Sequence, residues 1–124
     1  MGAQENKRTA QAAYAAFSRG DAEGAMANID DSIAWTVRGD NALTGTHKGK
    51  QAVGELWGQF LSKSFTTEPH DFIAEGNTVV VLATAKLDGE TVESADVLTY
   101  NDGGKLVGFD TLADETAPNR VYPR

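Results

Sequence analysis

The sequence predicts an α+β domain in which three helices lie against one face of a curved, mainly antiparallel sheet. Helical periodicity is confined to the first half of the chain, and four β segments follow one another in the second half. The turns between those segments are short and rich in Gly, Asn and Asp, so the neighbouring strands must be antiparallel. A sheet that wraps helices incompletely leaves space inside, and we therefore expect a cone-shaped domain with an internal pocket.

Three segments have the apolar spacing of amphipathic helices. The first places Tyr14 and Phe17 on one apolar stripe, and the third has a bulky aromatic side that includes Trp57 and Phe60. Asp21 is suited to cap a short second helix between them. The expected helices are residues 4–18, 21–29 and 50–62.

Five segments alternate apolar and polar residues as strands do, beginning with the one that contains Trp35 and Val37. A Gly-rich loop that carries His47 follows this first strand. The last residues, 115–124, contain two prolines and little periodicity, so a surface tail is expected there. The expected strands are residues 33–37, 66–74, 78–87, 91–100 and 105–113.

The composition restricts the classes of partner. A chain of 124 residues suits one domain over residues 1–124. The net charge of -7 disfavours nucleic acid and anionic membranes as partners, because phosphates attract clustered Lys and Arg. The chain has no cysteine and no long apolar run, and we expect a soluble, cytoplasmic protein.

Asp96 is the candidate on which the functional reading depends. It lies in the expected strand 91–100 and shares a face of that strand with Leu98 and Tyr100. A carboxylate is costly to bury unless it is hydrogen-bonded, neutralised or faces a cavity. Asp96 is therefore either a pocket acid with a raised pKa or a sheet-edge carboxylate that pairs with a surface Lys or Arg.

Three further residues are candidates for acid–base chemistry. His70 alternates onto one face with Phe72, so it is either a general base near neutral pH or a structural histidine. His47 lies in a loop where exposure is the default. Asp110 lies in the expected strand 105–113, where alternate residues face inward. The inward residues are either Gly108, Asp110 and Leu112 or Val107, Phe109 and Thr111, and the second set is the more apolar.

The pocket wall is expected from large apolar side chains, which in a small curved-sheet domain serve as both core and ligand contacts. No cofactor is expected, and a metal site is disfavoured because the two histidines are 22 residues apart with no acidic cluster of metal spacing. The expected lining residues are Tyr14, Phe17, Trp35, Val37, Trp57, Phe60, Phe72 and Leu98.

Four strings occur in this order along the chain: AYAAFSRGDAEG, IDDSIAW, GTHKGKQAV and ADVLTYNDGGKLVGF. Together they resemble the nuclear transport factor 2-like superfamily, and within it the SnoaL-like and ketosteroid-isomerase-like proteins, over residues 6–114. The resemblance implies the cone-shaped fold. It does not imply one activity, because proteins of this shape include isomerases, cyclases, hydrolases, dehydratases and binding proteins.

The resemblance transfers only part of a known site. Asp96 matches the position where ketosteroid isomerases hold a protonated aspartic acid that donates to an oxyanion. Their hydrogen-bonding tyrosine matches Ala13, with Tyr14 one place along, and their catalytic base matches Val37, which cannot take a proton. This argues against steroid isomerisation by the known mechanism. Residues 45–47 match the GTH of SnoaL-like cyclases, and Asp110 is the acid nearest to their base.

Two functions remain open at this stage. In the first, the pocket takes a small hydrophobic molecule, and Asp96 with His70, His47 or Asp110 catalyses a cofactor-free isomerisation, cyclisation, dehydration or hydrolysis. In the second, the protein is a binding or dimerisation module without chemistry. In either case a homodimer through the outer face of the sheet is expected, as the resemblance implies.

Overall fold

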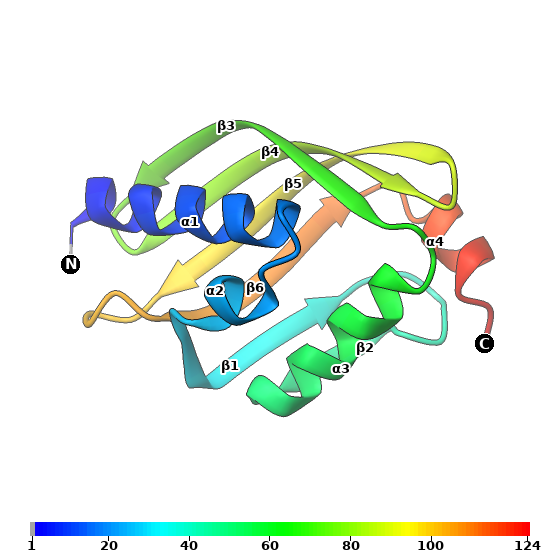
Figure 1. Ribbon diagram of the computed structural model, residues 1–124, viewed down its shortest axis with the longest axis horizontal. Coiled ribbons are helices and arrows are strands. Elements are labelled where there is room, and N and C mark those ends of the chain that lie inside the picture. The colour runs from blue at the N-terminus through cyan, green and yellow to red at the C-terminus, as the bar shows by residue number, and fades with distance from the viewer. Residues whose placement is uncertain (1) are drawn as a thin grey trace.

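Long strands joined by tight turns form the centre of the molecule (Figure 1). The computed structural model describes residues 2–124. The helices are α1 (Ala3–Ser18), α2 (Ala22–Met26), α3 (Lys50–Leu61) and α4 (Thr116–Val121). The strands are β1 (Ile29–Val37), β2 (Gly45–Lys48), β3 (Thr66–Glu75), β4 (Thr78–Leu87), β5 (Glu90–Tyr100) and β6 (Leu106–Ala113).

The six strands form one open sheet in the order β2-β1-β6-β5-β4-β3. The run from β3 to β6 is antiparallel throughout, as the short turns predict. β1 lies parallel to β6, and β2 pairs antiparallel with the outer edge of β1. The predicted α+β class is confirmed, with a mixed sheet and four helices instead of three.

Short-range hydrogen bonds set the junction between α1 and α2. Gly20 has a φ of 79°, which lets the chain turn out of α1 while the Asp21 N–H donates to the Ala16 carbonyl at 2.9 Å. Asp21 then caps α2, since its Oδ1 accepts from the Gly24 N–H at 2.8 Å. The sequence predicts both the end of α1 and this cap.

The helices cover one face of the sheet and enclose the core. α1 contacts β3 and β4, whereas α3 contacts β1 and β2, so each helix covers a different half of the sheet (Figure 1). Val53 and Leu56 of α3 and Val79 and Val81 of β4 are among the most deeply buried side chains of the core. No helix within residues 2–124 is long and apolar enough to cross a membrane.

Four elements differ from the sequence-based expectation. The helix α2 ends at Met26 instead of residue 29, and β1 begins at Ile29 instead of residue 33, because Ile29 pairs with Leu106 of β6. The loop that carries His47 contains strand β2, in which His47 pairs with Trp35 of β1. Residues 115–124 are not a surface tail, because they contain α4 and bury Ala117, Val121 and Tyr122. Pro118 is compatible with this helix because it lies in the first turn, where backbone N–H groups have no helical partner.

Candidate functional site

Asp96 projects from the centre of β5 toward the helices. It pairs with Val81 of β4 on one side and with Thr111 of β6 on the other. The strand alternation places it on the same face as the buried Leu98 and Tyr100, and its own side chain is only 6% exposed. A carboxyl group this deeply buried must be hydrogen-bonded or neutralised.

Two hydroxyl groups hold the Asp96 carboxyl group. The Tyr14 hydroxyl donates to Asp96 Oδ2 at 2.5 Å, and the Thr111 hydroxyl donates to Asp96 Oδ1 at 2.9 Å. The resemblance placed the hydrogen-bonding tyrosine position at Ala13, yet in the structure Tyr14 reaches the acid. Tyr14, Asp96 and Thr111 thus bring one helix and two strands together at one carboxyl group.

Burial is the main influence on both titratable groups of this cluster. It raises the pKa of Asp96 above its ordinary value, although the hydrogen bonds from Tyr14, Thr111 and Ser94 act in the opposite direction. The pKa of Tyr14 is raised well above its ordinary value by burial and by the neighbouring Asp96 charge and hydrogen bond. Asp96 is therefore a better proton acceptor than an exposed aspartate, and Tyr14 keeps its proton.

The cluster faces a cavity of about 210 Å³ with a largely aromatic wall. A cavity of about 150 Å³ already admits benzene in another protein, so there is room here for a small ring system. The chain has two Trp, three Tyr and five Phe, and eight of these ten side chains line the cavity. They are Tyr14, Phe17, Trp35, Trp57, Phe60, Phe65, Phe109 and Tyr122.

The aromatic rings support one another around the cavity. Trp35 stacks on Phe109 with ring centres 3.7 Å apart, and Trp57 meets the Trp35 ring nearly edge-on at 5.6 Å. Phe17 packs edge-on against Trp57 in turn. This wall presents both ring faces and ring edges to an occupant.

Seven of the eight expected lining residues lie at the cavity, and Phe72 does not. The seven are Tyr14, Phe17, Trp35, Val37, Trp57, Phe60 and Leu98. The Phe72 ring instead meets the Tyr14 ring edge-on at 5.7 Å, so that Phe72 contributes to the support of Tyr14. Val37 offers no titratable group at the position where the resemblance places a base.

His70 lies outside the cavity because β3 contains a bulge. The register with β4 shifts between Pro69 and Asp71, so His70 and Phe72 do not share a face as the strict alternation predicts. His70 is exposed, and its Nε2 lies 2.5 Å from the Thr84 hydroxyl. Thr84 in turn donates to Glu93 at 2.9 Å, on the outer face of the sheet.

His47 and Asp110 do not line the cavity either: His47 lies in the edge strand β2, beside Trp35, and Asp110 lies on the outer face of β6. His47 Nε2 lies 2.8 Å from the Leu43 carbonyl oxygen, within its own loop region. Asp110 accepts from Arg38 Nε and Nη2, both at 2.8 Å, on the outer side of β6. Phe109 and Thr111 line the cavity, in agreement with the more apolar of the two alternatives for β6.

Sequence reasoning missed two parts of this site. Thr111 was expected at most to face inward, and its place opposite Asp96 could not be counted from the turn NDGG, because the β5–β6 register shifts between Thr99 and Tyr100. The outer end of the cavity is lined by Arg38 and Asn41 of a loop and by Tyr122 of the C-terminal segment. These residues have no sequence signal, because their position depends on the docking of α4.

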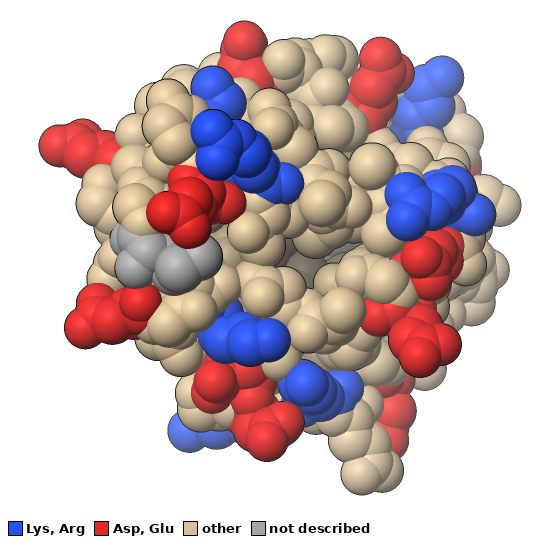
Figure 2. All heavy atoms as spheres, turned by 60° about the vertical axis from the view of Figure 1, so that its left-hand side comes forward, with Lys and Arg blue, Asp and Glu red and all other residues tan. Residues whose placement is uncertain are grey.

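The charged side chains lie mostly on the surface. Figure 2 shows one face with acidic and basic groups around a central hollow that is bordered by uncharged residues. Within residues 2–124, no three His, Asp or Glu side chains are grouped so that they could hold a metal ion. The site is thus one buried acid, its two hydroxyl partners and an aromatic wall.

Comparison with known proteins places this fold in the nuclear transport factor 2-like class. A family model described as a SnoaL-like domain matches residues 10–109. The chain therefore belongs to the SnoaL-like family. No functionally curated protein matches the chain.

Several solved structures are similar over nearly the whole chain. A nuclear transport factor 2-like protein from Burkholderia xenovorans LB400 is 28% identical, with a TM-score of 0.80 and 98% of each chain covered. One of unknown function from Burkholderia pseudomallei K96243 is 25% identical, with a TM-score of 0.83 over 96% of this chain and 98% of that one. TerC, co-crystallized with polyporic acid, is 25% identical, with a TM-score of 0.82 over 94% of this chain and 96% of its own.

Proposed function

We propose that this protein binds a small, mostly apolar molecule that carries a carbonyl or hydroxyl group, and that Asp96 transfers a proton to or from it without a cofactor. The observation that carries the proposal is a buried carboxyl group, held by Tyr14 and Thr111, that faces an aromatic cavity. Perturbed acids in clefts are often functional groups. Isomerisation, cyclisation, dehydration and hydrolysis are the reaction classes that suit such a group.

The geometry of Asp96 suits proton transfer in both directions. When ionised, its two oxygens offer about four acceptor positions, of which Tyr14, Thr111 and Ser94 take up to three, so at least one is left for a proton of the ligand. After it takes a proton from one carbon, the neutral acid can return that proton to another position of the same molecule. This sequence is an isomerisation and needs no second base, which fits the presence of Val37 at the position expected for one.

One similar structure supports a small organic ligand. TerC, with the same fold, was co-crystallized with polyporic acid. An aromatic wall with a few polar groups is also the usual make-up of small-molecule sites. Both points favour a hydrophobic ring compound with oxygen substituents as the occupant here.

The test is hydrogen–deuterium exchange at carbon. Polyporic acid and a panel of small conjugated ketones are first screened by thermal shift, because a ligand bound only to the native state raises its stability. Each ketone that binds is then incubated in D₂O with the wild-type protein or D96N, and exchange of its C–H protons is followed by NMR. We expect the wild type to accelerate exchange at least a hundredfold over D96N, because a positioned acid–base group contributes about 10²–10⁴-fold. Equal exchange with both proteins would contradict the catalytic role.

D71N is the matched control for this test. Asp71 is an exposed residue of β3 and does not line the cavity. Its replacement removes one carboxyl group from the protein surface and leaves Asp96 and the cavity wall in place. Exchange should therefore stay near the wild-type rate in D71N.

A ligand-binding module without chemistry is the second candidate. It is favoured by the position of His70, His47 and Asp110, none of which lines the cavity to act as a partner of Asp96. In this case Asp96 would only hold a ligand oxygen. Ligands would then bind the wild type but not D96N, and their C–H protons would not exchange faster with either protein.

We also propose that two copies associate through the outer face of the sheet, the face away from α1 and α3. Leu82, Ala95 and Leu112 form one row across β4, β5 and β6, and both leucines are exposed. Ile73 of β3 is exposed beside them. Copies that each carry a net charge of -7 repel one another, so an uncharged row is the favourable place for contact.

A further inference from the structure

The C-terminal segment, residues 114–124, closes one end of the cavity. β6 ends at Ala113, and the chain then turns into α4 and lies across the outer end of the sheet (Figure 1). Asp114, Glu115, Pro118 and Tyr122 all line the cavity. The SnoaL-like family model ends at residue 109, so this wall lies beyond the residues that the model matches.

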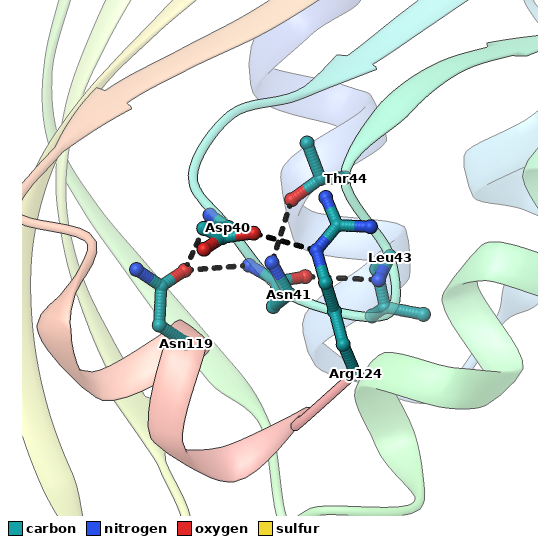
Figure 3. Close-up of polar contacts among 6 residues, drawn as sticks. All are labelled: Asp40, Asn41, Leu43, Thr44, Asn119 and Arg124. Carbon is teal, nitrogen blue, oxygen red and sulfur yellow. Dashed lines mark hydrogen bonds and ion pairs between the residues drawn. The ribbon is translucent and has the colours of Figure 1, made fainter.

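A polar contact with one loop holds the segment in place (Figure 3). The Asn119 side-chain oxygen accepts from the Asp40 N–H at 2.8 Å and from Asn41 Nδ2 at 3.0 Å. Arg124 Nε donates to Asp40 Oδ1 at 2.6 Å. The Ala42 N–H donates to the Tyr122 carbonyl oxygen at 2.8 Å.

The loop side of this contact is prepared by its own hydrogen bonds. Asn41 is only 1% exposed, and its Oδ1 accepts from the Leu43 N–H at 2.9 Å. The Asn41 N–H donates to the Thr44 hydroxyl at 3.0 Å. The loop is thereby folded so that Asn41 Nδ2 is directed at Asn119, as Figure 3 shows.

The buried apolar residues of the segment form their own small cluster. Val121 and Tyr122 lie in this cluster with Leu87, and neither belongs to the main core that contains Tyr14 and Trp57. The two clusters are joined through Leu43 and Phe60, which pack against both. Departure of the segment would therefore remove contacts from these two bridging side chains and leave the fully buried residues of the main core in place, as in elements that open locally.

We propose that the C-terminal segment is a gate for the cavity, with Asn119 as its latch: α4 and Tyr122 swing away from the loop of residues 38–44 to admit a ligand and close again over it. The gate depends on a cavity that takes a ligand but not on chemistry at Asp96. A gate without catalysis and catalysis without a gate are distinct outcomes, because cavity access and C–H exchange are measured separately.

A single engineered cysteine reports opening without any ligand. The chain has no native cysteine, so L98C carries the only thiol. Leu98 lines the cavity and is only 2% exposed, and cysteine is smaller than leucine, so the thiol fits and stays buried while the gate is closed. Its rate of reaction with methyl methanethiosulfonate then follows the open population.

N119A in the L98C background is the test variant, and N28A is the matched control. Asn28 Nδ2 donates to the Gly104 carbonyl at 2.6 Å, in the turn between β5 and β6. This turn lies at the end of the sheet opposite α4 (Figure 1). Loss of the two bonds to Asn119 should raise the thiol reaction rate about tenfold or more. N28A should leave the rate near that of L98C alone, and the free energy of unfolding of each variant is measured by urea titration.

Amide exchange of Ala42 gives a second readout that needs no cysteine. In the wild type, the Ala42 N–H should exchange faster than strand amides such as that of Val81, and N119A should accelerate Ala42 selectively. The proposed gate is wrong if N119A changes neither the thiol reaction rate nor the exchange rate of the Ala42 N–H. It is also wrong if N119A and N28A accelerate the thiol reaction equally, in proportion to global unfolding.

Discussion

Tyr14 and Asp96 are 82 residues apart in the chain, yet the Tyr14 hydroxyl donates to Asp96 Oδ2 at 2.5 Å beside an aromatic cavity. α1 delivers the phenol from one side, and β5 delivers the acid from the other. Because both groups are buried, water competes little for this hydrogen bond, and the protonation of one group depends on the other. The predictions on proton transfer depend on this pair.

The pH dependence of stability should report Asp96. Its folded-state pKa is raised, so between the unfolded value, about 3.9, and the folded value the native state holds a proton that the unfolded state releases. The free energy of unfolding should therefore fall as pH rises through this window, by about 1.4 kcal/mol for each pH unit between the two pKa values. D96N lacks this titration. Urea titrations of the wild type and D96N from pH 3 to 8 measure the free energy of unfolding of each protein. If this free energy changes with pH in the same way in both, the pKa of Asp96 is not raised.

Y14F should raise the pKa of Asp96 further. The hydrogen bond from Tyr14 is the largest influence that lowers this pKa, whereas burial remains after the substitution. Loss of the bond should also reduce the free energy of unfolding by about 1–2 kcal/mol. Carboxyl ¹³C NMR of Asp96 measures the pKa. Y100F is the control: it removes a buried phenolic hydroxyl on the same face of β5 and keeps the ring, and it should leave the Asp96 pKa close to the wild-type value.

T111V should act through the other oxygen of Asp96. Valine has the shape of threonine but cannot donate, so Asp96 Oδ1 loses its partner at 2.9 Å and the pKa of Asp96 rises. T111S keeps a hydroxyl at the same position and should restore the wild-type titration. The same NMR titration distinguishes the two variants. A rise in T111S as large as that in T111V would mean that packing, and not the hydrogen bond, sets the pKa.

Local signals in the sequence predicted most of the secondary structure. The Gly20 stop, the Asp21 cap and the turns between β3 and β6 are each specified by a few adjacent residues, and the elements next to them begin and end close to the expected positions. The end of α2 and the start of β1 were misplaced by three and four residues, because Ile29 fits the apolar spacing of a helix but pairs with β6. Tertiary contacts decided the rest. β2 forms because β1 offers an edge to Gly45–Lys48, and α4 forms where its apolar side finds Leu87 and Phe60.

The site was predictable only where strand alternation was regular. Asp96 lies in an unbroken stretch of β5, so its face could be counted from Leu98 and Tyr100. His70 lies at the bulge of β3, which moves it to the other face from Phe72. The adjacent Pro69 fits a bulge but fits an edge strand equally well, so it does not by itself reveal the change of register. Tyr14 was expected to line the cavity but not to contact Asp96, because the tyrosine position of the family was matched to Ala13. An error of one residue in such a match is a rotation of about 100° on a helix.

L82K should weaken association if the outer face of the sheet forms a homodimer. The substitution places a charge in the row formed with Ala95 and Leu112, where a lysine would lose hydration at the contact. Sedimentation analysis should show a dimer for the wild type and a monomer for L82K. L61K is the matched control, because Leu61 is an exposed leucine of α3, away from the sheet face. A monomeric wild type would refute the proposed dimer.

G39A should loosen the contact between the loop and α4. Gly39 has a φ of 105°, which side chains rarely adopt, and an added Cβ would lie 2.7 Å from Asn119 Oδ1 and 3.1 Å from Asn41 Nδ2. Both the backbone and the latch must then shift, and the free energy of unfolding should fall by about 2–4 kcal/mol. Ala42 amide exchange should accelerate at the same time.

G76A is the control that measures the cost of the backbone conformation without a close contact to Asn119. The φ of Gly76, 57°, also disfavours a side chain, but an added Cβ there would meet nothing within 4 Å. G76A should therefore cost only the conformational term, about 1–2 kcal/mol, and leave Ala42 exchange unchanged. Equal losses in G39A and G76A, with equal Ala42 exchange, would show that Asn119 has room to move and that Gly39 is not required by the docked α4. A larger loss in G39A, with faster Ala42 exchange, would show that the close approach of Gly39 to Asn119 helps to hold the C-terminal segment over the cavity.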